Sequence, residues 1–282
     1  DSSPSRGLGD VYKRQSLAVP DVNPGSQKAG RGMIVSQLWQ YPVKGLAGMA
    51  LDSTRLEAGK HFPGDRRFAV TNGHPKQDKA LAGHWVKKSF FLQMMKFEEL
   101  AAYDCDMAGE VMTLSKDGEE ILTADLSTKT GIRLVNEFFA ARFADRLDGL
   151  PQLTRVTDGA FTDTRAPWIS LGGTASVDRF GAATGTAPDA RRFRLNIMLE
   201  TDTPFEEASL VGTEVRLGEA VLRVEAPVGR CAAIDVDPAT ALRGPHYLPL
   251  MQREFGHADL GIFAEVTKGG LVRPGDRLTR LG

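Results

Sequence analysis

The chain has 282 residues, enough for one large domain or two smaller ones with a substantial core. Its 35 basic and 36 acidic residues leave a net charge of −1, which argues against a dedicated nucleic-acid surface, because such surfaces carry a basic excess. The longest stretch without charge, 166–177, is too short to span a membrane, and two cysteines exclude a disulfide framework. We therefore expect a cytoplasmic protein that binds no nucleic acid.

The first 32 residues show no periodic apolar pattern. Their best apolar run, Leu17–Val19, is far shorter than the ~7–15 residues that a secretory signal needs. We expect residues 1–32 to form a disordered or non-native leader, with the fold beginning at Met33.

The segment 33–150 alternates short apolar runs with turns, so we predict a first domain there. A hairpin loop is predicted at Lys116-Asp117-Gly118. A helix is predicted to begin at Ser127 or Thr128, because apolar residues then recur every three or four positions until Gly149-Leu150-Pro151. Strands are predicted at Ile34–Val43, Leu51–Glu57, Arg67–Thr71, Leu100–Tyr103, Val111–Leu114 and Glu119–Thr123.

The segment 151–282 is richer in hairpins and forms the predicted second domain. A short helix is expected at Ala175–Ala182, and Phe193–Asn196 is expected to open a strand. Alternating strands are predicted at Thr213–Leu217, Ala220–Val224, Ile262–Val266 and Leu278–Leu281. Many short, closely spaced strands favour a small β-barrel over a doubly wound sheet.

The usual cofactor motifs are absent from the sequence. No glycine-rich dinucleotide or phosphate loop occurs, and neither does an H-E-x-x-H, a C-x-x-C or a nucleophile elbow. Two cysteines are too few for an iron–sulfur cluster, which takes about four. We therefore expect no flavin, NAD, pyridoxal phosphate or iron–sulfur cluster within this chain.

Cys231 is the candidate for special chemistry. It follows Arg230, whose charge favours the thiolate, and the preceding Pro227 and Gly229 indicate that it lies in a loop or at a barrel rim. The spacing alone leaves open that Cys231 is a small buried core residue. Cys105 lies between two aspartates that disfavour its thiolate, so we interpret it as structural.

Three groups of cations are candidate phosphate ligands, since guanidinium pairs with phosphate oxygens. They are the arginine run ending at Arg194, the pair Arg66 and Arg67, and Lys44, where Gly45 leaves the backbone N–H approachable. Ordinary surface charge is the alternative for each of them.

These residues fall within segments that resemble a known family. The second half is similar to the MOSC domain, named for the C-terminal region of molybdenum cofactor sulfurases. The resemblance is carried by Ile169–Gly181, Arg192–Glu200, Val211–Val224, Gly229–Arg243 and Arg253–Leu278. The first half resembles the β-barrel domain that precedes MOSC, through Tyr41–Met49 and Gly64–Thr71. Within this family, the chain resembles the amidoxime-reducing components.

The resemblance implies an α+β fold that is mainly β, with a MOSC-type barrel packed against a smaller N-terminal β-barrel-like domain. It also implies a molybdenum–pterin cofactor whose metal takes one protein thiolate, and Cys231 stands at that place. The implied cofactor-binding residues are Lys44, Gly45, Arg66, Ser170, Thr174, Arg194, Asn196 and Arg230. Gly45 departs from the serine of many relatives, and Leu195 from a common proline.

Three hypotheses follow from the sequence. The first is a molybdenum oxidoreductase that reduces N-hydroxylated substrates and takes electrons from a separate ferredoxin- or flavoprotein-like partner. The second is a carrier or sulfur-handling protein for the cofactor, with a persulfide on Cys231. The third is a barrel without bound metal, in which Cys231 serves packing alone.

Overall fold

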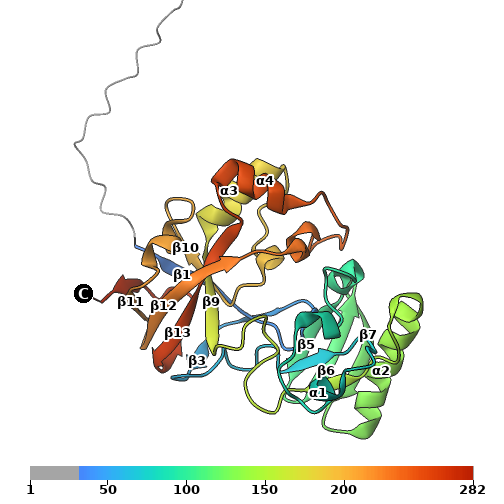
Figure 1. Cartoon of the computed structure of the whole chain (residues 1–282). Helices are drawn as coiled ribbons and strands as arrows, with labels where there is room; N and C mark the ends of the chain where they lie inside the picture. The colour runs from blue at the N-terminus through green and yellow to red at the C-terminus, as the bar shows by residue number, and fades with distance from the viewer. Residues whose placement is uncertain (1–31, 282) are drawn as a thin grey trace, which may run out of the picture. The chain divides into compact units, whose positions relative to one another are not determined.

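The computed structural model describes residues 32–281 (Figure 1), so the leader predicted at 1–32 lies, apart from Gly32, outside the described residues. The described residues belong to one compact unit. Its largest sheet runs in the order β15-β11-β12-β13-β9-β10-β1-β2. These strands are β1 (Ile34–Gln40), β2 (Met49–Leu51), β9 (Trp168–Gly173), β10 (Ile197–Glu200), β11 (Glu214–Leu217), β12 (Ala220–Gly229), β13 (Asp259–Lys268) and β15 (Leu278–Arg280).

The sheet closes into a barrel where β1 meets the chain leading into β15. Val35 donates its backbone N–H to the Asp276 carbonyl at 2.8 Å, and Leu278 donates to the Met33 carbonyl at 2.8 Å. Ile34 and Arg277 form an antiparallel bridge between these bonds. The predicted barrel is thus confirmed, and a strand from the first half of the chain completes it.

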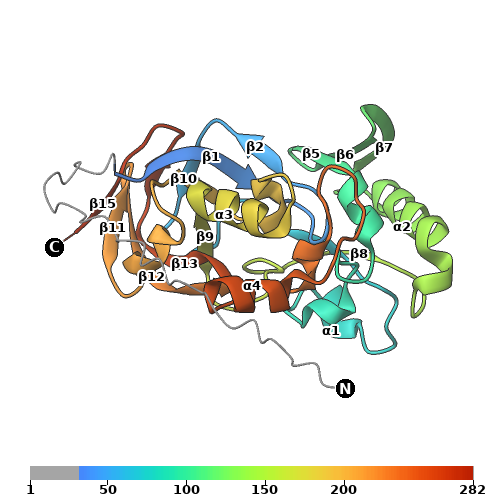
Figure 2. The ribbon, with the colours of Figure 1, turned by 90° about the horizontal axis from the view of Figure 1, so that it is seen from above.

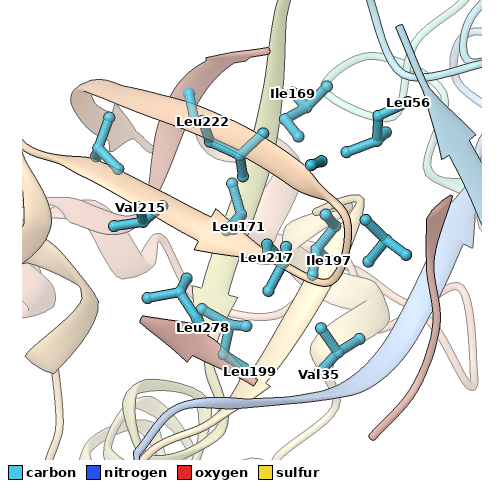
Figure 3. Close-up of a cluster of buried hydrophobic side chains, with 14 of the residues drawn as sticks. Val35, Leu56, Ile169, Leu171, Ile197, Leu199, Val215, Leu217, Leu222 and Leu278 are labelled. Atoms are coloured by element: carbon cyan, nitrogen blue, oxygen red, sulfur yellow. The ribbon is translucent and has the colours of Figure 1, made fainter. Parts of the chain in front are cut away.

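Apolar side chains from every wall fill the barrel (Figure 3). Along β12 the buried positions Ala220, Leu222 and Val224 alternate with more exposed ones, as a strand with one face inward requires. Val215 and Leu217 do the same on β11, so the predicted hairpin is confirmed. At about 25 cal/mol for each Å² of apolar surface removed from water, this interior is a main source of stability.

Two helices cover one side of the barrel (Figure 2). The first, α3 (Thr174–Thr184), joins the parallel strands β9 and β10 and confirms the helix predicted at Ala175–Ala182. It ends at Gly185, whose φ of 70° favours glycine. The second, α4 (Tyr247–Phe255), packs against α3 through contacts such as Phe180 on Tyr247.

A second apolar core lies under α2 (Lys129–Phe143), which packs on β7. The Thr128 side chain caps this helix by accepting the Gly131 N–H at 3.0 Å, which confirms the predicted start. The hairpin between β6 and β7 is also as predicted, since Asp117 and Gly118 both have positive φ. The strands here are β5 (Asp104–Ala108), β6 (Val111–Lys116) and β7 (Glu119–Asp125).

Two further strand pairs pack on the two cores, one on each. The strand pairs are β3 (Thr54–Leu56) with β14 (Gly270–Val272) and β4 (Phe68–Val70) with β8 (Leu153–Arg155). The remaining helices are α1 (Asp78–Leu81), η1 (Lys88–Phe90), η2 (Glu98–Ala102), η3 (Ala144–Arg146), η4 (Ala190–Phe193), η5 (Glu206–Leu210) and η6 (Ala232–Asp235). In the described range, no helix is both long and apolar enough to cross a membrane.

Three strand predictions were wrong in detail. Leu100–Tyr103 lies largely in η2, and the strand follows at β5, where buried Cys105 starts an alternating pattern. The single strand predicted at 51–57 is two, because its halves pair with different partners, β1 and β14. Phe193–Asn196 precedes the strand β10, since Arg194 adopts a left-handed conformation that ends η4.

Candidate cofactor pocket

A pocket of about 170 Å³ opens between the end of β12, the turn before β10, the loop before β9 and three segments of the first half. It gathers Cys231 and seven of the eight predicted binding residues, although they are spread over nearly 190 positions of the chain. The predicted residues that line it are Lys44, Gly45, Arg66, Ser170, Arg194, Asn196, Arg230 and Cys231.

Cys231 is half-buried and lies directly after β12, at the start of η6. Pairing of β12 with β13 ends at Gly229 opposite Asp259, so the chain is released from the sheet just before the cysteine. The Cys231 carbonyl accepts the Ile234 N–H at 3.1 Å and fixes the turn into η6. The prediction of a loop or barrel-rim position is therefore confirmed.

The Arg66 and Arg194 guanidiniums lie over the same aromatic ring. Their central carbons are 4.7 and 4.4 Å from the centre of the buried Tyr41 ring. Both residues have positive φ, 45° and 54°, an unusual backbone for arginine that directs the two side chains. Asp65 pairs with Arg66, and its other oxygen accepts the Tyr41 N–H at 2.8 Å. Tyr41 is thus a platform that positions both cations.

Two of the arginines that line the pocket have no carboxylate partner among the described residues. Arg194 donates to the Leu46 carbonyl and Arg230 to the Phe193 carbonyl at 2.7 Å, but neither forms a salt bridge within residues 32–281. Burial, together with the nearby Arg66 charge, lowers the pKa of Arg194 to about 10. Burial also lowers the pKa of Arg230 to about 10. The pocket therefore holds positive charge that an anion would stabilise.

Asp163 binds two lysines at the pocket wall. Its carboxylate lies 2.7 Å from Lys44 Nζ and 3.0 Å from Lys88 Nζ, while half of its side chain remains exposed. Partial burial opposes ionisation, yet the two ammonium groups hold the pKa of Asp163 well below its ordinary value. Burial likewise disfavours charge on Lys88, but Asp163 and Cys231 together raise the pKa of that lysine. A cation thus lies beside the cysteine sulfur.

Two predicted ligands bind each other. The side-chain oxygen of Asn196 accepts a hydrogen bond from the Ser170 hydroxyl at 2.9 Å and another from the Ser170 backbone N–H at 3.2 Å. This pair fixes the turn that presents Arg194 to the pocket. Thr174 does not line the pocket, because it lies on α3, where its hydroxyl accepts the Thr201 N–H at 3.3 Å.

Two family models match the chain in succession. The MOSC N-terminal beta barrel domain matches residues 32–148, and the MOSC domain matches residues 161–279. The chain is a MOSC-domain protein. Tyr41, Lys44 and Arg66 lie in the first matched segment, whereas Arg194 and Cys231 lie in the second. The pocket is therefore shared between both matched domains.

Curated relatives match the chain over short stretches. Molybdenum cofactor sulfurase of Drosophila mojavensis is 38% identical over 73 residues, covering 26% of this chain and 9% of the relative. The protein of the same name from Drosophila grimshawi is 34% identical over 90 residues, covering 32% and 11%. The matches thus span about a tenth of the length of these relatives. Among solved structures, YiiM from Geobacillus stearothermophilus aligns with 40% of this chain and 54% of its own, at 19% identity and a TM-score of 0.33.

Tyr41, Lys88 and Asp163 were missed by the sequence analysis of this MOSC protein. Tyr41 directly precedes the Pro42-Val43-Lys44 segment, so its position was a usable signal. Lys88 and Asp163 had none, because only folding brings them to Cys231. Cys105 is buried, and burial followed by the nearby Asp106 raises its pKa to about 12, in agreement with a structural role.

Proposed function

We propose that the protein is a molybdenum-cofactor-dependent oxidoreductase that reduces N-hydroxylated substrates with electrons from a separate donor protein. Membership of the MOSC family and the short matches to molybdenum cofactor sulfurases support the association with this cofactor. The reaction and the electron donor are proposed in addition to this association with the cofactor.

The observation that carries the proposal is the buried positive charge beside Cys231. Arg194 and Arg230 have backbone carbonyls as partners, and the buried Nε of Arg192 has no hydrogen-bond partner. Burying unpaired cations costs several kcal/mol, so a pocket built this way fits an anionic occupant. A phosphorylated pterin satisfies the guanidiniums, and the soft sulfur of Cys231 fits molybdenum.

The roles of the residues follow from their positions. Arg66 and Arg194, oriented by Tyr41, would bind the phosphate, and Arg230 would add a third guanidinium near the sulfur. Cys231 would bind the metal. Lys44 already donates to the Phe161 carbonyl at 2.8 Å and to Asp163, so we assign it a part in organising the wall. When bound, the cofactor supplies oxygen-atom transfer with two-electron redox chemistry.

The substrate would enter over an aromatic surface. The Trp168 and Phe263 rings lie 5.7 Å apart and both line the pocket, as do Met94 and Met95. A flat, weakly polar base stacks favourably on such a surface. Lys88 donates to Asp163 beside Cys231 and would orient the oxygen of an N–O group.

The test is the metal and pterin content of protein produced in a host that makes the cofactor. We expect about one molybdenum and one pterin per chain, loss of molybdenum in Cys231→Ala with an unchanged circular dichroism spectrum, and turnover of an N-hydroxylated amidine with dithionite as reductant. Wild-type protein that carries neither molybdenum nor pterin contradicts the proposal.

A carrier or sulfur-handling role is the alternative, favoured by the sulfurase names of the matched relatives and by the half-buried Cys231. In that case the protein retains pterin without turning over N-hydroxylated compounds. Mass spectrometry of the intact chain then shows an added sulfur on the wild type that is absent from Cys231→Ala.

A further inference from the structure

Positive charge is concentrated on one surface segment next to the pocket. Residues 73–97 contain five lysines and a single acidic residue, although the whole chain has a net charge of −1. Arg165, on the loop before β9, adds a further cation by stacking over Trp85 at 4.8 Å. We call Lys79, Lys87, Lys88 and Arg165 the basic rim.

Hydrogen bonds join the two chain segments that carry the basic rim. The His84 N–H donates to the Lys79 carbonyl at 3.0 Å, which closes the turn after α1. The Trp85 indole donates to the Thr162 carbonyl at 2.9 Å and joins this turn to the loop that carries Arg165. α1 itself packs on β8 (Figure 2). The cations from the two segments therefore lie on the same side of the molecule.

Three of these charges are available to a partner. Lys79, Lys87 and Arg165 are exposed, and none of them forms a salt bridge within the described range 32–281. Asp163 is bound by Lys44 and Lys88, and Asp78 adjoins Lys79 in the sequence. Lys88 is therefore paired with a carboxylate, whereas no salt bridge within residues 32–281 involves Lys79, Lys87 or Arg165.

The basic rim borders the pocket mouth. Lys88, Asp163 and Thr164 line the pocket, and Lys87 and Arg165 are their direct neighbours in the chain. A protein that docks here brings its own redox centre next to Cys231. Association steered by opposite charges is fast and weak, as repeated delivery of electrons requires.

We propose that the basic rim docks a small electron-transfer protein with an acidic surface. The inference rests on the proposed function and assigns the surface through which electrons arrive. The complementary partner carries Asp and Glu side chains around its redox centre, and the contact is small and sensitive to salt, as in other transient redox complexes.

The test compares two charge-reversed variants with equal change in charge. One carries Lys79→Glu, Lys87→Glu and Arg165→Glu, none of which lines the pocket. The control carries Lys129→Glu, Arg216→Glu and Lys268→Glu, which are exposed on α2, β11 and β13. Calorimetry measures the Kd of each for a plant-type 2Fe–2S ferredoxin and for a flavodoxin, both acidic, at low and at physiological salt.

We expect at least one acidic probe to bind the wild type and the control alike, and to bind the rim variant about tenfold more weakly or not at all. The proposal is overturned if neither probe binds the wild type, or if the rim and control variants bind equally. It is also overturned if the rim reversal abolishes binding to phosphatidylserine vesicles and leaves the protein probes unaffected. Dithionite-driven turnover reports separately on the proposed function, because dithionite needs no docking surface.

Discussion

Several features of Arg194 suit the binding of an anion but are unfavourable for the stability of the fold. Its guanidinium is buried beside Arg66, receives no carboxylate and sits on a backbone with φ of 54°. The unpaired charge and the repulsion from Arg66 are unfavourable, and an anion in the pocket would offset both. Such conflicts between local preference and observed structure are typical of binding sites.

Replacing Arg194 by Gln should separate these two effects. We expect the cofactor-free variant to melt at the same temperature as the wild type or higher, because a repulsive buried charge is gone. Inorganic phosphate should raise the melting temperature of the wild type, and its Kd should weaken about tenfold in the variant, since a charged hydrogen bond is lost. Arg216→Gln, exposed on β11, is the control. An equal phosphate-induced shift in wild type and Arg194→Gln would contradict the assignment.

Asp163 gives a prediction about pH. Its pKa is lowered in the folded protein, so the stability it contributes is present above the unfolded value of about 3.9 and is lost as pH falls through the folded value. Asp163→Asn should cost about 1–2 kcal/mol, less than a fully buried pair, because half of the side chain is exposed. Urea denaturation should show this difference constant between about pH 5 and 8 and shrinking below about pH 4. Asp145→Asn, at an exposed position, should show no such dependence.

The position of single residues in the pocket was predictable where they lie in segments that resemble the MOSC family. For Cys231 and Lys44 the neighbouring residues alone left other interpretations open, and the resemblance selected them. The roles of Lys88 and Asp163 depend on two loops that meet only in three dimensions. Thr174, which the resemblance implied, does not line the pocket, because it lies on α3 and its hydroxyl accepts the Thr201 N–H.

At the scale of elements, hairpins and amphipathic helices followed from local patterns. The turn at Asp117-Gly118 and the cap at Thr128 depend on the chemistry of adjacent residues, which is fully present in the sequence. η2 was mistaken for a strand, since a run of apolar residues of that length has no distinguishing period. The split between β2 and β3 could not be seen, because it arises from two different partner strands.

Gly131 provides a test of α2. Alanine normally stabilises a helix relative to glycine by about 1 kcal/mol. Here a Cβ atom would lie 1.9 Å from the Asp125 carbonyl oxygen, so the chain leading into the helix must shift. We expect Gly131→Ala to destabilise the protein by about 1–3 kcal/mol in urea denaturation. Lys129→Ala, exposed in the first turn, should change stability by less than about 0.5 kcal/mol. A stabilised Gly131→Ala protein would show that this contact is not tight.

At the scale of the whole molecule, the two halves share both their barrel and their pocket. β1 lies between β10 and the segment leading into β15, and β3 pairs with β14. Tyr41 and Lys44 follow directly from β1, so the strand that closes the barrel also brings one cation and the ring under Arg66 and Arg194 to the pocket. We propose that a domain boundary lies near residue 150 of the sequence. We also propose that the two domains depend on each other for folding.

Separate expression of the two halves tests this dependence. A fragment of residues 151–282 lacks β1 and β3, so it exposes the edges of β10 and β14 and loses Met33, Val35 and Leu38 from the barrel core. We expect it to show no cooperative thermal transition by circular dichroism. Supplying residues 33–150 on a second chain should restore the transition, because the missing strands can pair in trans. A cooperative transition in the 151–282 fragment alone would mean that its barrel closes without β1, and that the pocket is assembled by docking of two independently folded domains.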